Sequence, residues 1–367
     1  MSSFIYLTCQ PGSEQTLKNE VSAINGLRFA FSKPGFITFK TDEDNIAYRR
    51  NAVIRCRDFV FAQTAGHSFG VVKVEQTENN GDIADKIWSR FLESEKTTDV
   101  SIYAPIRIHC WERCGIVAGE NGYEPSISRN ALAMHKQLVS KVPLNVKMAT
   151  GAKDPFLPAQ NGDNVLDCVA VTSNEWWLGT HYVDESSGEH SRWAGGVVPL
   201  QLPADAVSRA WLKFEEAIRW SGIEINNGDT CLDIGAAPGG ASQALLARGA
   251  SVIGLDPGVI APQVLQNPNF THSRFRTNQV KKKTFKNIRW IISDMNVAPN
   301  YTLETLEDFI NNPELKISGL LFTLKLFNKE MADSIPSHLK RIRNWGFKQV
   351  KAKQLIFNRQ EIMVACK

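Results

Sequence analysis

The chain has 367 residues, of which 43% are hydrophobic and 22% charged, a composition typical of a globular protein with two or three domains. No run of about 18 apolar residues occurs and the N-terminus has no basic, cleavable leader, so membrane-spanning and secreted proteins are disfavoured and a cytoplasmic location is expected. Seven cysteines at irregular spacings do not indicate a disulfide framework.

The first 200 residues alternate between patterns typical of strands and of helices. Apolar or alternating runs predict strands at residues 4–8, 35–40, 100–110, 165–172 and 175–183. Apolar residues at helical spacing predict helices at residues 14–24, 83–92 and 128–139. This order favours sheets with helices packed on one side, and no catalytic motif is visible in this half of the chain.

From residue 208 onward the strands become short and nearly all apolar, as in a parallel sheet that is buried on both faces. They are expected at residues 230–234, 251–255, 288–293, 319–324 and 361–366. Helices are expected after a Ser208 cap and at residues 240–248 and 330–344. The pattern predicts a doubly wound α/β domain that binds its ligands at the carboxyl ends of the strands. Residues 203–209 (PADAVSR) mark the start of this domain.

The positive charge of the chain is concentrated in this second part. Residues 201–367 contain 22 Lys and Arg against 15 Asp and Glu, whereas residues 1–200 contain 20 against 23. Basic residues cluster at 281–283 and at Lys340, Arg341, Arg343, Lys348, Lys351 and Lys353. Such clusters suit a phosphate backbone, and solvated helix faces are the alternative interpretation.

The strongest motif is CLDIGAAPGGASQALL at residues 231–246, where a buried strand runs through a glycine-rich turn into a helix. Glycine lets the backbone approach a ligand closely, and the unpaired N–H groups at the start of a helix suit an anion such as a methionine carboxylate. The spacing is not G-x-G-x-x-G, which weakens a dinucleotide interpretation and favours a methyl donor. Asp256 ends the next strand, where a carboxylate can accept hydrogen bonds from a ribose diol.

The segment after the strand 288–293 indicates which atom is methylated. It reads Asp294-Met295-Asn296-Val297, without the Pro-Pro-aromatic turn of amino-group methylases or a nearby nucleophilic Cys for base methylation, so a hydroxyl target fits better. Lys213, Lys325 and Glu361 complete the set of candidate residues. A lysine at the end of an apolar strand is costly to bury unless it is paired, so the pKa of Lys325 is expected to fall.

Lys213, Asp294, Lys325 and Glu361 match, in order and strand position, the Lys-Asp-Lys-Glu tetrad of FtsJ-type ribose 2′-O-methyltransferases, and the chain resembles that family. The resemblance is closer still to members that methylate a cytidine of large-subunit (23S) ribosomal RNA, and the matching segments run from TCQPGSE near the N-terminus to NRQEIMV near the C-terminus. Two departures are Asn278, where an acidic residue on the adenine side is expected, and Phe327, where a proline is expected.

The resemblance implies a ferredoxin-like region at residues 1–75, a THUMP-like RNA-binding domain at 76–195 and a Rossmann-like methyltransferase domain at 196–367. It implies that the tetrad is catalytic, with Lys325 as the base that takes the proton of the ribose 2′-hydroxyl, and that no metal is needed. The cofactor would be S-adenosyl-L-methionine, held by Ser208, Asp233, Gly235, Ala236, Pro238, Gly239, Gly240, Asp256, Asn278 and Asp294. The expected partner is RNA, specifically 23S ribosomal RNA before the subunit is fully assembled, and a monomer is expected.

Four other interpretations stay open. The chain could be a non-catalytic RNA-binding protein that retains a methyltransferase fold, or an NAD-dependent enzyme, although its glycine spacing disfavours the latter. His109, Cys110 and Cys114 in HCWERC resemble half a zinc site, but no second pair at suitable spacing is evident, so buried thiols are the default interpretation. The aromatic residues Trp176, Trp177, Tyr182 and Trp193 could stack on RNA bases or pack in the core.

Overall fold

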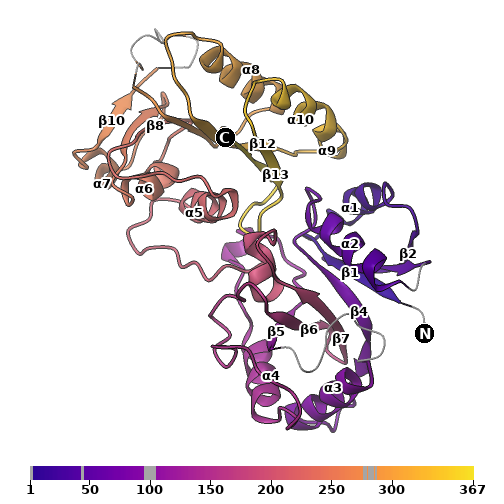
Figure 1. The fold of residues 1–367 in the computed structure, drawn as a ribbon. Coiled ribbons are helices and arrows are strands. Elements are labelled where there is room, and N and C mark those ends of the chain that lie inside the picture. The colour runs from indigo at the N-terminus through magenta and orange to yellow at the C-terminus, as the bar shows by residue number, and fades with distance from the viewer. Residues whose placement is uncertain (1–2, 43–44, 95–104, 276–278, 280–284, 286) are drawn as a thin grey trace. The chain divides into compact units, whose positions relative to one another are not determined.

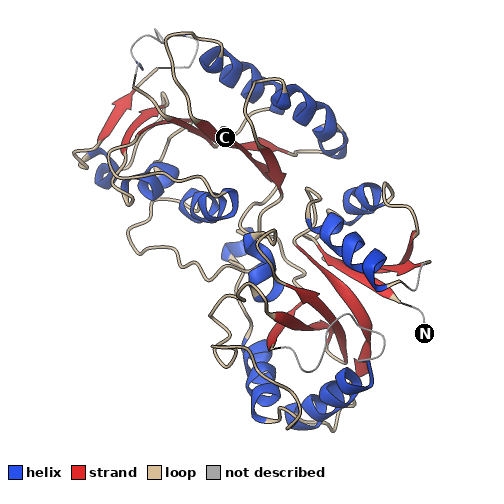
Figure 2. Cartoon of the chain, viewed as in Figure 1, coloured by secondary structure: helices blue, strands red, loops and turns tan. Residues whose placement is uncertain are grey.

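The computed structural model describes residues 3–42, 45–94, 105–275, 279, 285 and 287–367. The chain divides into two compact units, Met1–Pro199 and Leu200–Lys367 (Figure 1). Each unit is built on its own seven-stranded sheet (Figure 2). Among the described residues, no helix has both the length and the apolar character needed to cross a membrane.

The sheet of the first unit is mainly antiparallel. Its strand order is β2 (Leu27–Lys33), β3 (Phe36–Thr41), β1 (Phe4–Thr8), β4 (Thr64–Lys73), β7 (Glu175–Tyr182), β6 (Asn164–Thr172) and β5 (Ile106–Glu112). Only β5 and β6 pair in parallel. The helices are α1 (Glu14–Val21), α2 (Ile46–Arg57), α3 (Asn80–Ser94) and α4 (Arg129–Ser140), with short 3₁₀ turns η1 (Glu120–Gly122), η2 (Glu189–Arg192) and η3 (Ala194–Gly196).

Helices α3 and α4 pack on the sheet because each has one apolar face. Ile83, Ile87 and Phe91 recur four residues apart on α3 and are buried in one core cluster with Met134 and Leu138 of α4. Residues 95–104 lie outside the described part of the chain, so only the second half of the strand expected at 100–110 can be checked, and it begins at Ile106.

The aromatic residues proposed for base stacking lie mostly inside this unit. Trp176 belongs to the α3/α4 core cluster and Trp193 is buried. The Trp177 ring stacks on Phe31 with 5.5 Å between ring centroids. These contacts are those of core packing, the alternative weighed above.

The sheet of the second unit is largely parallel. Its strand order is β10 (Phe270–Ser273), β9 (Ser251–Leu255), β8 (Thr230–Ile234), β11 (Trp290–Ser293), β12 (Gly319–Lys325), β14 (Glu361–Cys366) and β13 (Val350–Lys353). The strands from β10 to β12 are parallel, and β14 runs antiparallel to both β12 and β13. The chain order reverses between β8 and β11, and ligands bind at such a switch point, beyond the carboxyl ends of the strands.

Helices cover both faces of this sheet. In Figure 1, α5 (Ala210–Ser221), α6 (Gly240–Leu246) and α7 (Pro262–Leu265) lie on one face, and α8 (Pro299–Ile310), α9 (Lys329–Asp333) and α10 (Ile335–Arg343) lie on the other. The doubly wound α/β architecture expected for this part of the chain is confirmed.

Two local expectations were wrong. Arg209 is the N-cap residue of α5 and no side chain caps this helix, so Ser208 is not the cap. The helix expected at 330–344 is divided into α9 and α10 around Ser334. The break has a local cause, because Pro336 lacks an N–H group and its ring would clash with the carbonyl group four residues earlier in a continuous helix.

Candidate active site

Four charged side chains meet at the carboxyl ends of β11 and β12. Asp294 follows β11, and Lys325 is the last residue of β12. Glu361 begins β14 and pairs directly with Lys325 in the antiparallel register. Lys213 reaches the same point from the first turn of α5. Residues that are far apart in the sequence are therefore brought together by the topology of the sheet.

The four side chains form a closed ring in which positive and negative charges alternate. Lys213 Nζ lies 2.5 Å from Asp294 Oδ2 and 3.1 Å from Glu361 Oε1. Lys325 Nζ lies 2.8 Å from Asp294 Oδ1 and 2.6 Å from Glu361 Oε2. Each side chain is at most 12% exposed, so the two positive and two negative charges are buried and balanced.

The pKa of Lys325 contradicts the expectation from the sequence. Burial alone would lower this pKa, but the carboxylates of Asp294 and Glu361 outweigh burial and hold it above the ordinary lysine value. Burial likewise opposes ionisation of Asp294, whereas the ammonium groups of Lys213 and Lys325 keep its pKa below the usual range. The prediction of a lowered lysine pKa was therefore wrong, and Lys325 is an ammonium ion at neutral pH in the free protein.

Further side chains, not identified from the sequence, fix the ring in place. Thr323 Oγ1 donates a hydrogen bond of 2.7 Å to Asp294 Oδ1. The fully buried carboxylate of Glu216, three residues after Lys213, accepts hydrogen bonds from the backbone N–H groups of Ile356 and Phe357. Glu216 thereby anchors the segment that leads into Glu361. Its position three residues after Lys213, on the same face of the helix, was the only sequence feature that could have identified Glu216.

The glycine-rich turn lies beside this ring, after β8. Gly235 has φ +82°, and a Cβ on it would lie 2.9 Å from Cγ of Met295, in the segment after β11. Gly239 has φ +118°, and a Cβ there would meet the side chain of Val264 at 2.8 Å. Both positions therefore require glycine for backbone conformation as well as for space.

The other cofactor candidates on this turn occupy different environments. Ser208 packs against Gly240 so closely that a Cβ on Gly240 would overlap the Ser208 hydroxyl. Ala236 is buried, whereas Pro238 is exposed. Asp233 is fully buried, and its Oδ2 accepts a 2.6 Å hydrogen bond from Ser242. Ser208 Oγ and Asp233 Oδ1 are buried without a hydrogen-bond partner in the protein.

Asp256 closes the other side of the turn. Its Oδ2 accepts a hydrogen bond from the backbone N–H of Ala237 at 3.2 Å, and its Oδ1 accepts one from Gly258 at 2.6 Å. Asn278 lies outside the described residues, as does the basic run 281–283. Phe327, the second departure from the resemblance, is 49% exposed.

Comparison with known proteins identifies the second unit. Residues 206–352 match the model of the family described as FtsJ-like methyltransferase. This match covers most of the second unit, which is therefore similar to FtsJ-like methyltransferases. The chain is also 26% identical to "Ribosomal RNA large subunit methyltransferase M" of Tolumonas auensis, in an alignment covering 97% of this chain and 93% of the relative. The protein of the same name from Aeromonas salmonicida is 24% identical, over 98% of this chain and 95% of the relative. The one from Pseudoalteromonas translucida is 30% identical, over 54% of this chain and 56% of the relative.

The basic residues of this methyltransferase unit do not form one uniform patch. Lys340, Arg343 and Lys348 are exposed. Arg341 instead forms a bidentate pair with Glu307, and Lys353 is buried. The described surface thus offers fewer free positive charges to a phosphate backbone than the sequence cluster indicates.

The buried Asp233 makes the stability of the methyltransferase unit dependent on pH. Burial, together with the carboxylates of Asp294 and Asp256, raises the pKa of Asp233 to about 7 against the hydrogen bond from Ser242. A carboxyl with a raised pKa stabilises the fold below its unfolded pKa and loses that contribution as pH rises toward 7. The free energy of unfolding of Asp233→Asn, compared with that of the wild type, should therefore increase by roughly 2–4 kcal/mol between pH 4 and pH 8.

Urea unfolding of both proteins at the two pH values measures this difference. Asp229→Asn is the control of opposite sign. Burial favours the neutral form of Asp229, but hydrogen bonds from Asn226, Trp290 and Arg289 lower its pKa. The free energy of unfolding of the Asp229 variant, compared with that of the wild type, should therefore decrease between pH 4 and pH 8. A pH-independent difference for Asp233→Asn would contradict the raised pKa.

Proposed function

We propose that this chain transfers a methyl group from S-adenosyl-L-methionine to a ribose 2′-hydroxyl of large-subunit ribosomal RNA. The observation that carries the proposal is the closed ring of Lys213, Asp294, Lys325 and Glu361 beside the glycine-rich turn. The similar proteins from Tolumonas auensis and Aeromonas salmonicida are ribosomal RNA large subunit methyltransferases by name, which supports this class of substrate. A cytidine is the nucleoside implied by the sequence resemblance.

The residues around the glycine-rich turn fit the proposed cofactor. Ser208 and Asp233 each have a buried oxygen without a protein partner, as expected of groups that bind a polar ligand. Asp256 follows β9, where a carboxylate can bind the ribose diol. Gly235 and Gly239 keep the turn free of side chains. When bound, S-adenosyl-L-methionine supplies a methyl group on a positively charged sulfur.

Lys325 is proposed as the base for the ribose hydroxyl. Only its neutral form can accept the proton, and this form is a small fraction at neutral pH because Asp294 and Glu361 raise its pKa. The two carboxylates also fix the position of the Lys325 amine, so that the incoming hydroxyl meets an oriented nitrogen. Lys213 contributes the second positive charge that balances the two carboxylates.

The rate of the chemical step should therefore rise with pH. The neutral fraction of a lysine grows about tenfold per pH unit below its pKa, and the ordinary lysine pKa is about 10.4. Single-turnover methylation should climb close to tenfold per unit between pH 7 and 9, without reaching a plateau. Donor affinity measured at each pH separates this effect from binding. A plateau below pH 9 would show that Lys325 is not the base or that substrate binding lowers its pKa.

The direct test of the function is a methylation assay on ribosomal RNA. Purified full-length protein, 23S ribosomal RNA lacking the modification and labelled S-adenosyl-L-methionine should give one methylated position. Nuclease digestion and mass spectrometry should place the label on a ribose, as 2′-O-methylcytidine. Label on a base would contradict the hydroxyl target. Tight RNA binding without donor binding would favour the non-catalytic RNA-binding alternative.

Two substitutions test the donor site. Asp256→Ala should weaken S-adenosyl-L-methionine binding because ribose hydrogen bonds are lost, by about 10-fold for a net loss near 1.5 kcal/mol. Gly235→Val should weaken it more strongly, because the new side chain meets Met295 and strains the turn. Calorimetric titration measures both, with the exposed Asp333→Ala as control. Unchanged affinity in both variants would mean that the donor binds elsewhere.

The first unit is proposed to bind the RNA. The sequence resemblance assigns residues 1–75 to a ferredoxin-like region and 76–195 to a THUMP-like domain, and β1 to β7 supply a mixed α/β unit of suitable length. A monomer is proposed as the working form.

A further inference from the structure

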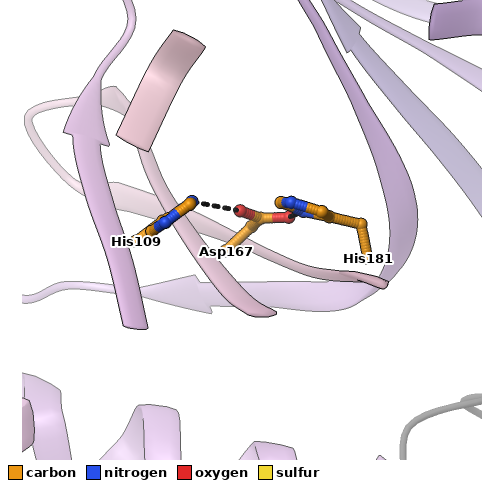
Figure 3. Close-up of side chains that lie close together, drawn as sticks. All are labelled: His109, Asp167 and His181. Atoms are coloured by element: carbon orange, nitrogen blue, oxygen red, sulfur yellow. Dashed lines mark hydrogen bonds and ion pairs between the residues drawn. The ribbon is translucent and has the colours of Figure 1, made fainter. Parts of the chain in front are cut away.

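A second polar cluster lies in the first unit, whereas the residues proposed for methyl transfer belong to the second. His109 of β5, Asp167 of β6 and His181 of β7 come from three neighbouring strands (Figure 3). His109 pairs with Asp167 in the parallel register of β5 and β6. All three side chains are buried, and one donor atom from each lies within 4.8 Å of the others. The described residues contain no other such group of His, Cys, Asp or Glu.

His181 makes close contacts through both of its ring nitrogens. Its Nε2 lies 2.8 Å from the carbonyl oxygen of Ser191, which can only accept, so Nε2 carries a proton. Its Nδ1 lies 2.5 Å from Asp167 Oδ2, which also accepts a 2.5 Å hydrogen bond from Tyr6. In a neutral ring this Nδ1 has a lone pair that faces a carboxylate. Either a second proton or a metal ion must lie between them.

His109 distinguishes between these two cations. The residue is 4% exposed, and neither of its ring nitrogens has a hydrogen-bond partner. Oδ1 of Asp167, 3.8 Å from His109 Nδ1, also has no hydrogen-bond partner. A proton on His181 would leave His109 and this oxygen unsatisfied, whereas a metal ion would use all three groups.

We propose that His109, Asp167 and His181 bind one Zn²⁺ ion that joins β5, β6 and β7. Two imidazole nitrogens and one carboxylate oxygen are a donor set that zinc accepts, with one position left open. Bonds of about 2.0–2.1 Å in a tetrahedral site place the donors about 3.3 Å apart. Oδ2 of Asp167 lies 2.5 Å from His181 Nδ1, and Oδ1 lies 3.8 Å from His109 Nδ1, so binding one ion through one carboxylate oxygen requires a rotation of the Asp167 side chain. Ser191 and Tyr6 would orient the ligands from outside.

The cysteines suggested by the sequence do not take part. His109 and Cys110 are consecutive residues of β5 and therefore face opposite sides of the sheet. Cys110 packs in the α3/α4 core, and the Cys114 thiol donates a hydrogen bond to the carbonyl oxygen of Ile116. The half zinc site expected from HCWERC is thus absent from the described residues, and only its histidine belongs to the proposed site.

Nearby arginines define the competing arrangement. The buried guanidinium of Arg57 interacts electrostatically with Tyr6 and Asp167. Arg107 is neutralised by Asp163 at 3.0 Å. Without zinc, Asp167 would serve as the counter-ion of Arg57 and of a doubly protonated His181. The two arrangements differ in metal content and in the protonation of His181, and both can be measured.

The test uses the untagged full-length protein after treatment with a chelator. Titration with Zn²⁺ against a chromophoric chelator should give one tight site per chain. His109→Asn should lower zinc affinity by more than about 100-fold, and Tyr6→Phe, which retains all three ligands, by about 10–100-fold. His338→Asn in the second unit is the matched control and should bind zinc like the wild type.

X-ray absorption of the zinc-loaded wild type should show two imidazole ligands, which keeps the test decisive if His109→Asn does not fold. The proposal is overturned if the wild type holds no stoichiometric zinc or if His109→Asn binds it equally well. It is also overturned if nitrogen NMR finds both ring nitrogens of His181 protonated at saturating zinc. Methylation activity is not needed for any of these measurements.

Discussion

Lys325→Ala is expected to reduce single-turnover methylation by about 10²–10⁴-fold, the usual contribution of a general base. Affinity for S-adenosyl-L-methionine should stay close to that of the wild type, because the Lys325 amine contacts Asp294 and Glu361 and is proposed to face the ribose hydroxyl and not the donor. Rapid-quench measurement of methyl transfer, together with calorimetric titration of the donor, separates the two effects.

The matched control for this variant is Lys316→Ala, the same substitution at an exposed position of the same unit, which should leave the rate unchanged. Removing Lys325 also leaves Asp294 and Glu361 with one ammonium between them, so the folded fraction must be checked by thermal unfolding. Lys325→Met keeps the apolar stem and serves as the better-folded test. A rate above about a tenth of the wild-type value in a folded variant would exclude Lys325 as the base, because a general base contributes at least about 100-fold.

Three of the four members of the charged ring could be located from the sequence because they mark the ends of strands. Asp294 and Lys325 end apolar strands of a predicted parallel sheet, and the carboxyl ends of such strands lie at one edge. Glu361 was placed correctly because the last strand begins with it. Strand patterns therefore predicted which residues meet, and the measured distances agree with that grouping.

The electrostatics of the ring could not be predicted in the same way. The expected fall in the pKa of Lys325 followed from burial alone, whereas the sign depends on two carboxylates lying within 3 Å of its nitrogen. Such distances follow from tertiary structure and leave no trace in local sequence. The same holds for Glu216, whose partners are backbone groups 140 and 141 residues away.

In the first unit, sequence patterns predicted single elements but not their pairing. The strand at Phe4–Thr8 was predicted correctly, yet its position between β3 and β4 depends on long-range pairing. The cluster of His109, Asp167 and His181 was missed for the same reason, since a long connection separates β5 from the hairpin of β6 and β7. Cys110, which is adjacent to His109 in the sequence, faces the opposite side of β5 and does not belong to the cluster.

The second large effect is expected for Asp294→Asn, which should lower the free energy of unfolding by about 3–5 kcal/mol, because it leaves a buried charge uncompensated. In the wild type, Lys213 and Lys325 are balanced by Asp294 and Glu361, so the ring is neutral. The amide retains an oxygen for Thr323 but removes one negative charge, and the ring becomes positive. Urea unfolding at pH 7 without donor measures the change.

A double-mutant cycle with Lys213→Met shows whether charge balance is the cause. Lys213→Met alone leaves the ring with one excess negative charge, and the double variant with Asp294→Asn leaves the neutral pair of Lys325 and Glu361. The double variant should therefore be more stable than the sum of the two single effects predicts, by at least about 1 kcal/mol, as expected for directly interacting residues. Additive losses would mean that Asp294 stabilises the unit through its hydrogen bond with Thr323 and its packing, and that the ring is not held together by its alternating charges.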